Sequence, residues 1–323
     1  MRRLSPLGIV ALALLSAAPA AFAKKDRLPR FPNAQFLTGY PPFSLILTTP
    51  SRTLWLQHDG RSGWYVIPTI SSDGRVVASA RPAPGDPPRS TRLLAATRST
   101  GSGAWVEIPS LPLRSGAVAI SPDGSKLACV TRWRYDAPSR LRVLDLRTGR
   151  VLLGPEVLDT AGTDISWAPD SRHLAFDMGD NGSPVKSNPS PLRAIYLLDV
   201  DTGTVRRLRT GVAPSWSPSG AWIAYLDYFP DHDSAHSFAA PHPNRLCLMR
   251  ADGSDPRVLL TFPPREDLRI APVWSPDSQA ILINRWRDRQ KGTMDLYTFN
   301  LSSHRVTRMR KDVLPVYAWL PAR

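Results

Sequence analysis

The sequence predicts an all-β protein: a six-bladed β-propeller with four antiparallel strands in each blade. Three observations predict this fold. A turn motif recurs about every fifty residues, short strands follow each copy of it, and the C-terminal segment repeats only the beginning of the motif. The chain has 323 residues, of which 42% are hydrophobic, so it can form a large core. With 20 Gly and 33 Pro, it does not suit a long-helix or coiled-coil protein.

The repeated motif consists of an apolar residue, then Ser or Ala, Pro, Asp, and Gly or Ser. Its Asp position is filled by Asp73, Asp123, Asp170, Ser219 and Asp277, so successive copies lie 50, 47, 49 and 58 residues apart. Pro presets the backbone, Asp accepts hydrogen bonds from nearby amides, and Gly tolerates a positive φ. Each copy therefore predicts a tight turn.

Short apolar strands follow each turn. The expected second strands are Leu127–Thr131, Leu174–Phe176, Ile223–Leu226 and Ile281–Asn284. The expected third strands are Leu141–Asp145, Ile195–Asp199, Leu246–Met249 and Leu296–Phe299. A Thr-Gly or Asp-Gly turn then leads to a fourth strand. Four short antiparallel strands in each repeat are typical of a propeller blade.

The two ends of the chain are expected to share the sixth blade and so close the ring. Trp319 and Pro321 repeat the Trp and Pro positions of the motif, while Phe43–Thr48, Thr53–Gln57 and Gly63–Ile67 are expected to supply the other three strands. An open ring would expose two sheet edges, and interleaving the chain ends removes both. We expect the propeller to span residues 36–323.

Residues 1–23 predict a cleaved signal peptide. Two arginines precede the apolar run Leu7–Leu15, and an Ala-Phe-Ala cleavage site ends at Ala23. A buried N-terminal helix is the alternative interpretation. Residues 24–35 are expected to form a flexible N-terminal segment. No later stretch is long and apolar enough to span a membrane, so the sequence predicts a periplasmic or secreted protein.

The Trp-Ser-Pro-Asp turns and the Leu-x-Asp-x-x-Thr-Gly strands resemble those of TolB-type periplasmic propellers, over about residues 36–323. The resemblance implies an interaction scaffold in the cell envelope. TolB also carries an α/β domain before its propeller, by which it is tied to the Tol–Pal system. Only Lys24–Gln35 precedes the expected ring here, so we expect a scaffold role without a strict Tol–Pal role. Related propellers also occur in peptidases, lyases and binding proteins.

The connections between second and third strands are long, whereas most other turns are tight. These connections are Arg81–Ser90, Arg132–Ser139, Gly179–Leu192, Tyr228–Asn244 and Trp286–Gly292. In a propeller they all emerge on the same face. Long loops on a rigid scaffold are common places for binding.

This face is basic and aromatic, which predicts a partner-binding surface. Its candidate residues are Arg132, Trp133, Arg134, Tyr135, Asp164, Tyr228, Phe229, Arg285, Trp286, Arg287 and Arg289. Arginines beside aromatic rings suit protein hot spots and anionic ligands. The alternative is a charged rim without a partner, because Arg is abundant throughout the chain. The expected partner is an envelope or secreted protein, and an acidic protein would suit a basic face. No nucleic-acid-binding motif is present.

Asp164 is unusual among these residues. It precedes the motif position by six residues, where the other innermost strands carry Ala117, Ala213, Ala271 or Val316. A carboxylate there can meet a cation or a partner's Lys or Arg. A solvated Asp at the end of a loop is the alternative.

One loop concentrates histidines and gives weak metal-ligand candidates: His232, Asp233, His236 and His242. Flanking prolines disfavour a helix that would bring His232 and His236 together. A polar, solvated insertion is the alternative, and we expect no metal and no cofactor.

The two cysteines fall in a second strand and in a third strand two blades away. Cys129 and Cys247 are therefore expected to be too far apart for a disulfide and to be buried free thiols.

Catalytic signatures are missing from the sequence. It contains no Gly-x-Ser-x-Gly, His-Glu-x-x-His, phosphate-binding Gly-x-x-x-x-Gly-Lys or Cys-x-x-Cys pattern. We therefore expect a non-enzymatic, monomeric, exported interaction module. The alternative is an enzyme or ligand-binding propeller acting on an anionic glycan, such as a polyuronate, through the Arg-rich face and the loop histidines.

Overall fold

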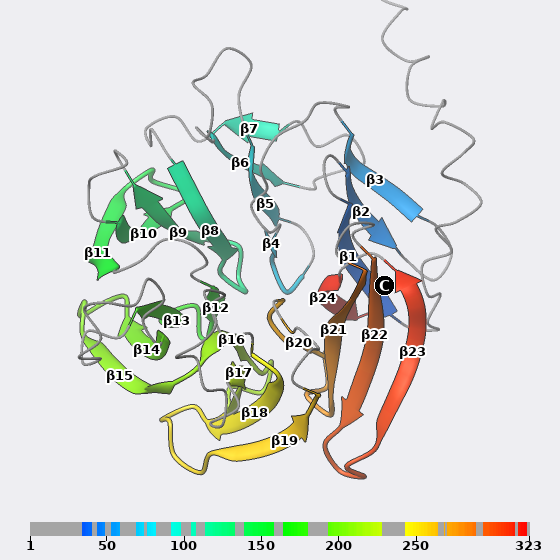
Figure 1. Ribbon diagram of the computed structural model, residues 1–323. Coiled ribbons are helices and arrows are strands. Elements are labelled where there is room, and N and C mark those ends of the chain that lie inside the picture. The colour runs from blue at the N-terminus through cyan, green and yellow to red at the C-terminus, as the bar shows by residue number, and fades with distance from the viewer. Residues whose placement is uncertain are drawn as a thin grey trace, which may run out of the picture.

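The computed structural model describes the greater part of the chain from residue 34 onward (Figure 1). The described residues are 34–40, 44–48, 53–58, 69–73, 76–81, 92–97, 105–107, 114–132, 139–157, 164–179, 193–227, 243–263, 268, 270–288, 293–313 and 316–321. All secondary structure in these ranges is β-strand. A helix long and apolar enough to cross a membrane does not occur in them. The predicted signal peptide lies outside the described residues.

Six four-stranded antiparallel sheets contain the strands of the described ranges, and they stand around a common centre as the blades of a propeller (Figure 1). The first two sheets in chain order hold β1 (Ala34–Tyr40), β2 (Ser44–Thr48) and β3 (Thr53–His58), then β4 (Thr69–Ile70), β5 (Val76–Arg81), β6 (Arg92–Thr97) and β7 (Trp105–Glu107). The next two hold β8 (Arg114–Ile120), β9 (Lys126–Arg132), β10 (Ser139–Asp145) and β11 (Val151–Val157), then β12 (Ile165–Trp167), β13 (His173–Gly179), β14 (Arg193–Asp199) and β15 (Val205–Thr210). The last strands are β16 (Val212–Trp216), β17 (Trp222–Asp227), β18 (Arg245–Arg250) and β19 (Arg257–Thr261), then β20 (Val273–Trp274), β21 (Ala280–Asp288), β22 (Thr293–Asn300), β23 (Val306–Val313) and β24 (Val316–Pro321). The all-β propeller expected from the sequence is confirmed.

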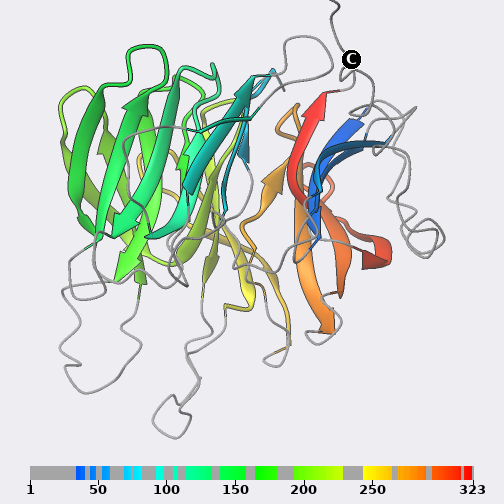
Figure 2. The ribbon, with the colours of Figure 1, turned by 90° about the horizontal axis from the view of Figure 1, so that it is seen from above.

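The strands run along the axis of the ring, as the second view shows (Figure 2). In each sheet the innermost strand borders the centre, and the following strands step outward in chain order. Apolar side chains from neighbouring sheets fill the space between blades. One such cluster joins Ala175 and Ile195 of one blade to Ile223 and Tyr225 of the next. The core is therefore a set of junctions around the ring.

The first and last strands of the described chain belong to the same sheet. β24 is its innermost strand and pairs with β1, with Ala34 opposite Pro321 and Phe36 opposite Trp319. The sequence correctly associates the two ends, but it misses β1 and places the first N-terminal strand at Phe43. β1 begins at Ala34, not at residue 36. No copy of the turn motif precedes β1, and it is held as a strand by pairing with β24 and β2. The expected strand Gly63–Ile67 lies outside the described residues.

The repeated turn is held by the serine at its start. In three copies the Ser hydroxyl donates to the Asp two residues later: Ser71 to Asp73 at 2.6 Å, Ser121 to Asp123 at 2.6 Å and Ser275 to Asp277 at 2.5 Å. The same hydroxyl oxygen accepts the N–H that opens the second strand, as Ser275 does from Ala280 at 2.8 Å. Hydrogen bonds from Ser275 and from the N–H of Gln279 hold the pKa of Asp277 below its usual range.

Two tryptophans fasten innermost strands to the blade before them. The indole N–H of Trp167 donates to the carbonyl of Ala119 at 2.9 Å, and that of Trp274 donates to the carbonyl of Ser215 at 2.9 Å. Both acceptors lie on the preceding innermost strand. Trp216, at the same position of the motif, instead donates to the carbonyl of Gly220 in its own turn at 3.1 Å. An indole combines a large apolar surface with one donor, and at this position the donor serves either contact.

Candidate functional site

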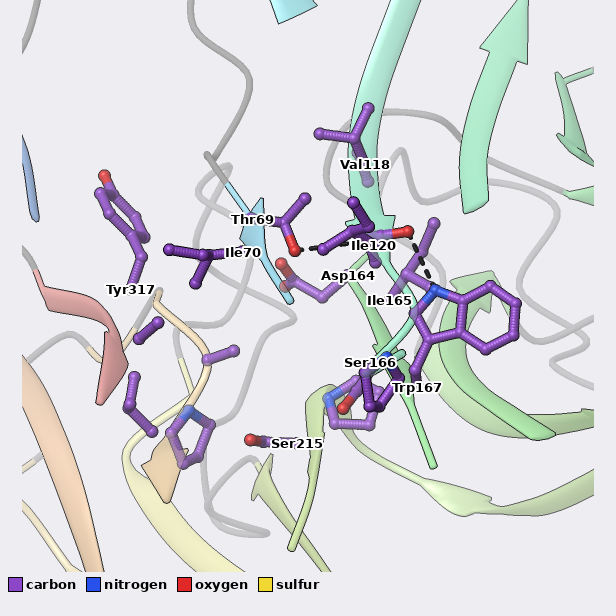
Figure 3. Close-up of a pocket in the computed structure, with 18 of the residues that line it drawn as sticks. Thr69, Ile70, Val118, Ile120, Asp164, Ile165, Ser166, Trp167, Ser215 and Tyr317 are labelled. Carbon is purple, nitrogen blue, oxygen red and sulfur yellow. Dashed lines mark hydrogen bonds between the residues drawn. The ribbon is translucent and has the colours of Figure 1, made fainter. Parts of the chain in front are cut away.

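The innermost strands enclose a cavity of about 240 Å³ at the centre of the ring (Figure 3). β4, β8, β12, β16, β20 and β24 all contribute residues to its wall. Residues with polar side chains in this wall include Thr69, Asp164, Ser166, Ser215 and Tyr317. Most of the remaining wall is apolar. Among the described residues that line the cavity, Asp164 is the only carboxylic acid, and none is Lys, Arg or His.

Asp164 is held in place through its main chain. It lies directly before β12, its N–H donates to Oδ1 of Asp177 at 2.5 Å, and its carbonyl accepts the N–H of Asp177 at 3.2 Å. The Asp164 side chain is half-buried at the cavity (Figure 3). Within the described part of the chain, no residue forms a hydrogen bond to its carboxyl group.

Asp177 lies fully buried on β13, and its carboxyl group forms an ion pair with Arg193. Arg193 Nε donates to Asp177 Oδ2 at 3.0 Å, and an Nη of Arg193 donates to the Asp177 carbonyl at 3.1 Å. The N–H of Ala213, on the next blade, also bonds to the Asp177 carboxylate. Asp177 thus ties its own blade to the next one.

These contacts separate the roles of the two carboxyl groups. Burial, together with the nearby charge of Asp177, raises the pKa of Asp164 to about 8, although Arg193 opposes the shift. Burial raises the pKa of Asp177 as well, but the Arg193 guanidinium and the N–H groups of Asp164 and Ala213 oppose that shift, so Asp177 ionises more readily than Asp164. Asp164 accordingly holds a proton at neutral pH.

This arrangement bears on one sequence expectation. Asp164 ends the connection before β12, as a loop-end residue would, but Asp177 holds its main chain against the inner end of β13 and its side chain is half-buried. The sequence carried a signal for this. Asp177 interrupts an apolar second strand seven residues after Asp170, and Asn284 interrupts another seven residues after Asp277.

Arg285 and Trp286, two candidates for the partner-binding face, lie on β21. Arg285 is half-buried, an Nη donates to the Tyr297 hydroxyl at 2.8 Å, and the guanidinium carbon stands 5.5 Å from the centre of the Tyr297 ring. Asp295 lies opposite Arg285 on β22. The Arg285 side chain therefore packs within its own blade. Trp286 is half-buried, and its indole N–H has no hydrogen-bond partner among the described residues.

The structure does not bring Asp164 and Arg285 together, since one borders the cavity and the other packs on Tyr297. Arg132 and Arg287 lie at the ends of β9 and β21, where only the strand path is described. The remaining candidates lie outside the described residues: Trp133, Arg134, Tyr135, Tyr228, Phe229 and Arg289, together with the metal-ligand candidates His232, Asp233, His236 and His242. No metal-binding cluster of His, Cys, Asp and Glu occurs in the described ranges.

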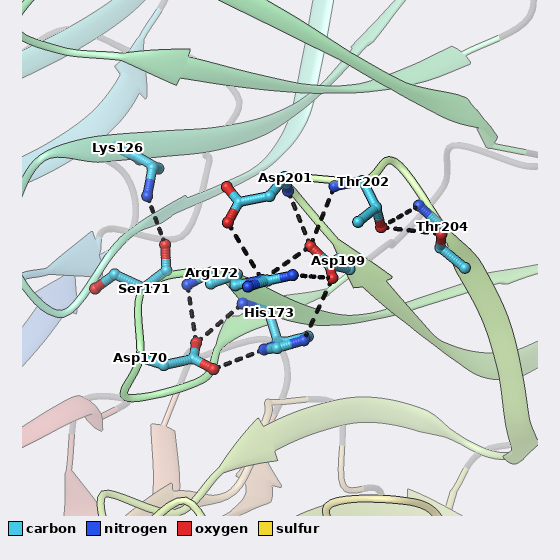
Figure 4. Close-up of polar contacts among 9 residues, drawn as sticks. All are labelled: Lys126, Asp170, Ser171, Arg172, His173, Asp199, Asp201, Thr202 and Thr204. Atoms are coloured by element: carbon cyan, nitrogen blue, oxygen red, sulfur yellow. Dashed lines mark hydrogen bonds and ion pairs between the residues drawn. The ribbon is translucent and has the colours of Figure 1, made fainter.

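The opposite end of the ring carries a polar network that holds turns together (Figure 4). Arg172, in the β12–β13 turn, contacts Asp199 Oδ2 at 2.7 Å and Asp201 Oδ2 at 3.2 Å across the blade. His173 Nδ1 lies 2.6 Å from Asp170 Oδ2. A hydrogen bond from Arg172 is the first reason that the pKa of Asp199 lies well below its usual range. These carboxylates are occupied by turn amides and by Arg172, so the network stabilises the blade.

No protein-family model matches the chain, and no curated protein does. Among solved structures, TolB from Acinetobacter baumannii is similar, with a TM-score of 0.65 and 17% identity over 90% of this chain and 67% of that one. A TolB-assigned protein of Agrobacterium tumefaciens is similar with a TM-score of 0.59 and 15% identity, over 90% of this chain and 96% of that one. This chain has the fold of a TolB-type propeller. Identities this low establish the shared fold alone.

An oligogalacturonate lyase from Vibrio parahaemolyticus also matches the TolB-type propeller described here. Its TM-score is 0.49, with 16% identity over 85% of this chain and 71% of the lyase. A likeness at this level carries no argument about activity.

Proposed function

We propose that this TolB-type propeller is an exported, non-enzymatic scaffold that binds an acidic protein in the periplasm or cell envelope. Three features support the proposal. The fold is that of TolB-type propellers, residues 1–23 have the pattern of a signal peptide, and the long connections share one end of the ring.

The single observation that carries the proposal is this shared end. Asp177, near the end of second strand β13, bonds to Asp164 at the start of β12. Asn284, well along second strand β21, bonds to Val316 at the start of β24. The ends of second strands and the starts of innermost strands thus lie at one face. The longest connections of the chain leave from this face, whereas the opposite end has turns as short as residues 121–125 and 200–204.

Arginines are frequent at strand positions next to this face. They are Arg81, Arg92, Arg114, Arg132, Arg140, Arg193, Arg245, Arg285 and Arg287. Register pairs Arg81 with Arg92 and Arg114 with Arg132 across neighbouring strands. Arg193 and Arg285 contact residues of their own blades, and Arg132 and Arg287, at the ends of β9 and β21, are the positions chosen for the test. A positive face steers an acidic protein toward it and disfavours a basic one.

The test compares charge reversal at the two ends of the ring. The mature full-length chain, a variant with Arg132→Glu and Arg287→Glu, and a control with Arg147→Glu and Arg150→Glu in the β10–β11 turn are each used to recover partners from envelope extract. We expect the wild type and the control to recover the same acidic protein, and the first variant to bind it at least tenfold more weakly. Equal binding by all three chains would contradict the proposal.

Two further measurements address export and catalysis. Cell fractionation should find the chain in the periplasm with Lys24 at its N-terminus, and a cytoplasmic chain that retains residues 1–23 would contradict export.

Purified chain should not turn over polyuronates. Turnover that His232→Ala abolishes would replace the scaffold by the lyase alternative.

A further inference from the structure

We propose that the central cavity binds one organic cation, a guanidinium or primary ammonium group, through the Asp164 carboxyl group. The proposal goes beyond the scaffold function, because it rests on the cavity and does not require the basic face. It assigns a ligand class to a region that neither the sequence motifs nor the structural comparisons assign.

The ionisable groups of the cavity differ from those of the chain as a whole. The chain carries a formal net charge of +14, yet the described lining contains one carboxyl group and no basic side chain. Within the described residues, that carboxyl group accepts no hydrogen bond. A cation in the cavity would supply the missing partner.

The fold itself does not need an acid at this position. In four of the other five blades, the equivalent residues are Ala117, Ala213, Ala271 and Val316. Each of these blades forms its sheet with an apolar side chain there. Asp164 is therefore a departure from the repeat, and its carboxyl group makes no described contact that stabilises the blade.

The surrounding charges leave Asp164 as the acceptor for a ligand. From β13 it faces Asp177, whose carboxylate is committed to Arg193 on β14 and to the N–H of Ala213. β16 adds Ser215 to the lining and no charged group, and β24 adds Tyr317. Among described residues, these are the titratable and charged groups around Asp164. Arg193 is already paired, so it does not exclude a second cation.

The shape and chemistry of the cavity favour an organic cation over a divalent metal. Ca²⁺ takes six to eight oxygen ligands and Mg²⁺ requires a near-octahedral set, which one carboxyl group and scattered hydroxyls do not provide. A guanidinium group pairs with a single carboxylate through two parallel hydrogen bonds. A volume of about 240 Å³ accommodates such a group with a short alkyl stem, and Ile70, Ile120 and Ile165 provide apolar wall for the stem.

The cation can come from a free small molecule or from the Lys or Arg side chain of a protein partner. The first arm of the test titrates the mature full-length chain with methylguanidinium, with neutral methylurea as the matched control, and follows binding by NMR. The second arm uses the peptide Gly-Arg-Gly. Binding of methylguanidinium supports a site open to small cations, and binding of the peptide alone supports capture of a side chain. Binding of neither probe, or equal binding of methylurea, would overturn the proposal.

Substitutions then locate the site. Asp164→Ala, which restores the residue of three other blades, should fold like the wild type and bind at least tenfold more weakly. Asp164→Asn should do the same if Asp164→Ala loses stability. Asp201→Asn, an exposed change at the opposite end of the ring, should leave binding unchanged. Full binding by both Asp164 variants would place the cation elsewhere and refute the proposal.

The pH dependence gives a test that needs no variant. Binding a cation requires the ionised carboxylate, so the ligand must displace the Asp164 proton. Affinity for methylguanidinium should rise about tenfold per pH unit toward pH 8 and then level, because the pKa of Asp164 is raised to about 8 and guanidinium stays charged throughout. An affinity that does not change between pH 6 and pH 8 would contradict a site on Asp164.

Discussion

Asp177 and Asn284 occupy the same place in their blades, seven residues after Asp170 and Asp277, respectively. Both are buried polar residues on second strands, and both bond to the innermost strand of the next blade. Asn284 donates from Nδ2 to the Val316 carbonyl at 2.8 Å and accepts the Val316 N–H on Oδ1 at 2.8 Å. The Asn284 side-chain amide thus makes the two hydrogen bonds to the Val316 main chain that a neighbouring strand would otherwise make. At the equivalent positions of two other blades, Val130 and Leu226 are buried apolar residues.

Removing the Asn284 amide should destabilise the chain. Asn284→Ala leaves the N–H and carbonyl of Val316 without their partner in a buried place, which costs about 2–4 kcal/mol of unfolding free energy. Urea denaturation measures this loss. Gln279→Ala, an exposed change in the turn before the same strand, is the control and should stay within about 0.5 kcal/mol. A loss as small as that of the control would show that Val316 finds another partner.

Stability should depend on pH through Asp164. Its pKa is about 8 in the folded chain and about 4 when unfolded, so the folded chain binds more protons between these values. The free energy of unfolding contributed by this group is therefore fully present below about pH 4 and is lost as the pH rises toward 8. Asp164→Ala should become more stable relative to the wild type as the pH rises. Urea denaturation from pH 4.5 to 8.5 measures the difference, and parallel curves would contradict the burial of this carboxyl group.

The sequence predicts the state of a single residue correctly where that state depends only on the residue's position in a strand. Cys129 and Cys247 are buried free thiols as predicted, and burial is the main reason that the pKa of each is raised to about 12. The sequence also marks Asp164 as unusual. Its burial could not be predicted, because it depends on Asp177 and Arg193, which the fold brings to it from two other strands.

At the scale of the element, the repeated turn accommodates either Gly or Ser in a left-handed conformation. The residue after the Asp position is Gly124 (φ 74°), Ser171 (φ 55°), Gly220 (φ 76°) or Ser278 (φ 59°). Each Ser hydroxyl accepts an N–H from the turn of another blade: Ser171 from Asp123 at 3.3 Å and Ser278 from Ser219 at 3.0 Å. These bonds offset part of the cost of a positive φ for serine.

Serine substitutions should separate backbone strain from steric conflict. A Cβ on Gly220 would lie 3.7 Å from its nearest neighbour, Pro169 Cγ, whereas a Cβ on Gly124 would lie 2.9 Å from Val76 Cγ2. Gly220→Ser should cost about 1–2 kcal/mol of unfolding free energy for the left-handed conformation. Gly124→Ser should cost more, because it adds the overlap with Val76. Urea denaturation compares the two variants. Equal losses of unfolding free energy would contradict the close contact between Gly124 and Val76.

Strands with a motif before them are predicted well, and a strand without one is missed. The expected strands Leu141–Asp145 and Leu246–Met249 fall within β10 and β18. β1 has no such turn before it, and its partner β24 is separated from it by nearly the whole chain. Local pattern cannot identify a strand that depends on so distant a partner. Arg285, one of the predicted partner-binding residues, packs on Tyr297 of the adjacent strand.

At the scale of the whole molecule, a sequence period is sufficient to predict a propeller, because each repeat has the same four-stranded form. The period also suggests where the chain ends meet, since Trp319 falls in the Trp position of the motif. The central cavity could not be predicted in the same way. Its contents depend on one residue from each innermost strand, and the motif fixes only the turn that follows them.

The pairing of β1 with β24 is the central structural claim, and truncation tests it most directly. Ending the chain after Leu314 removes β24, exposes the edge of β1 and removes Val316 from the cluster that also contains Val273, Leu282 and Leu296. Ending it after Pro321 leaves β24 whole and is the control. The closed sheet predicts that the melting temperature of the shorter chain falls by about 10 °C or more while that of the control is unchanged. Equal melting temperatures for the two chains would contradict the closure of the ring by its first and last strands.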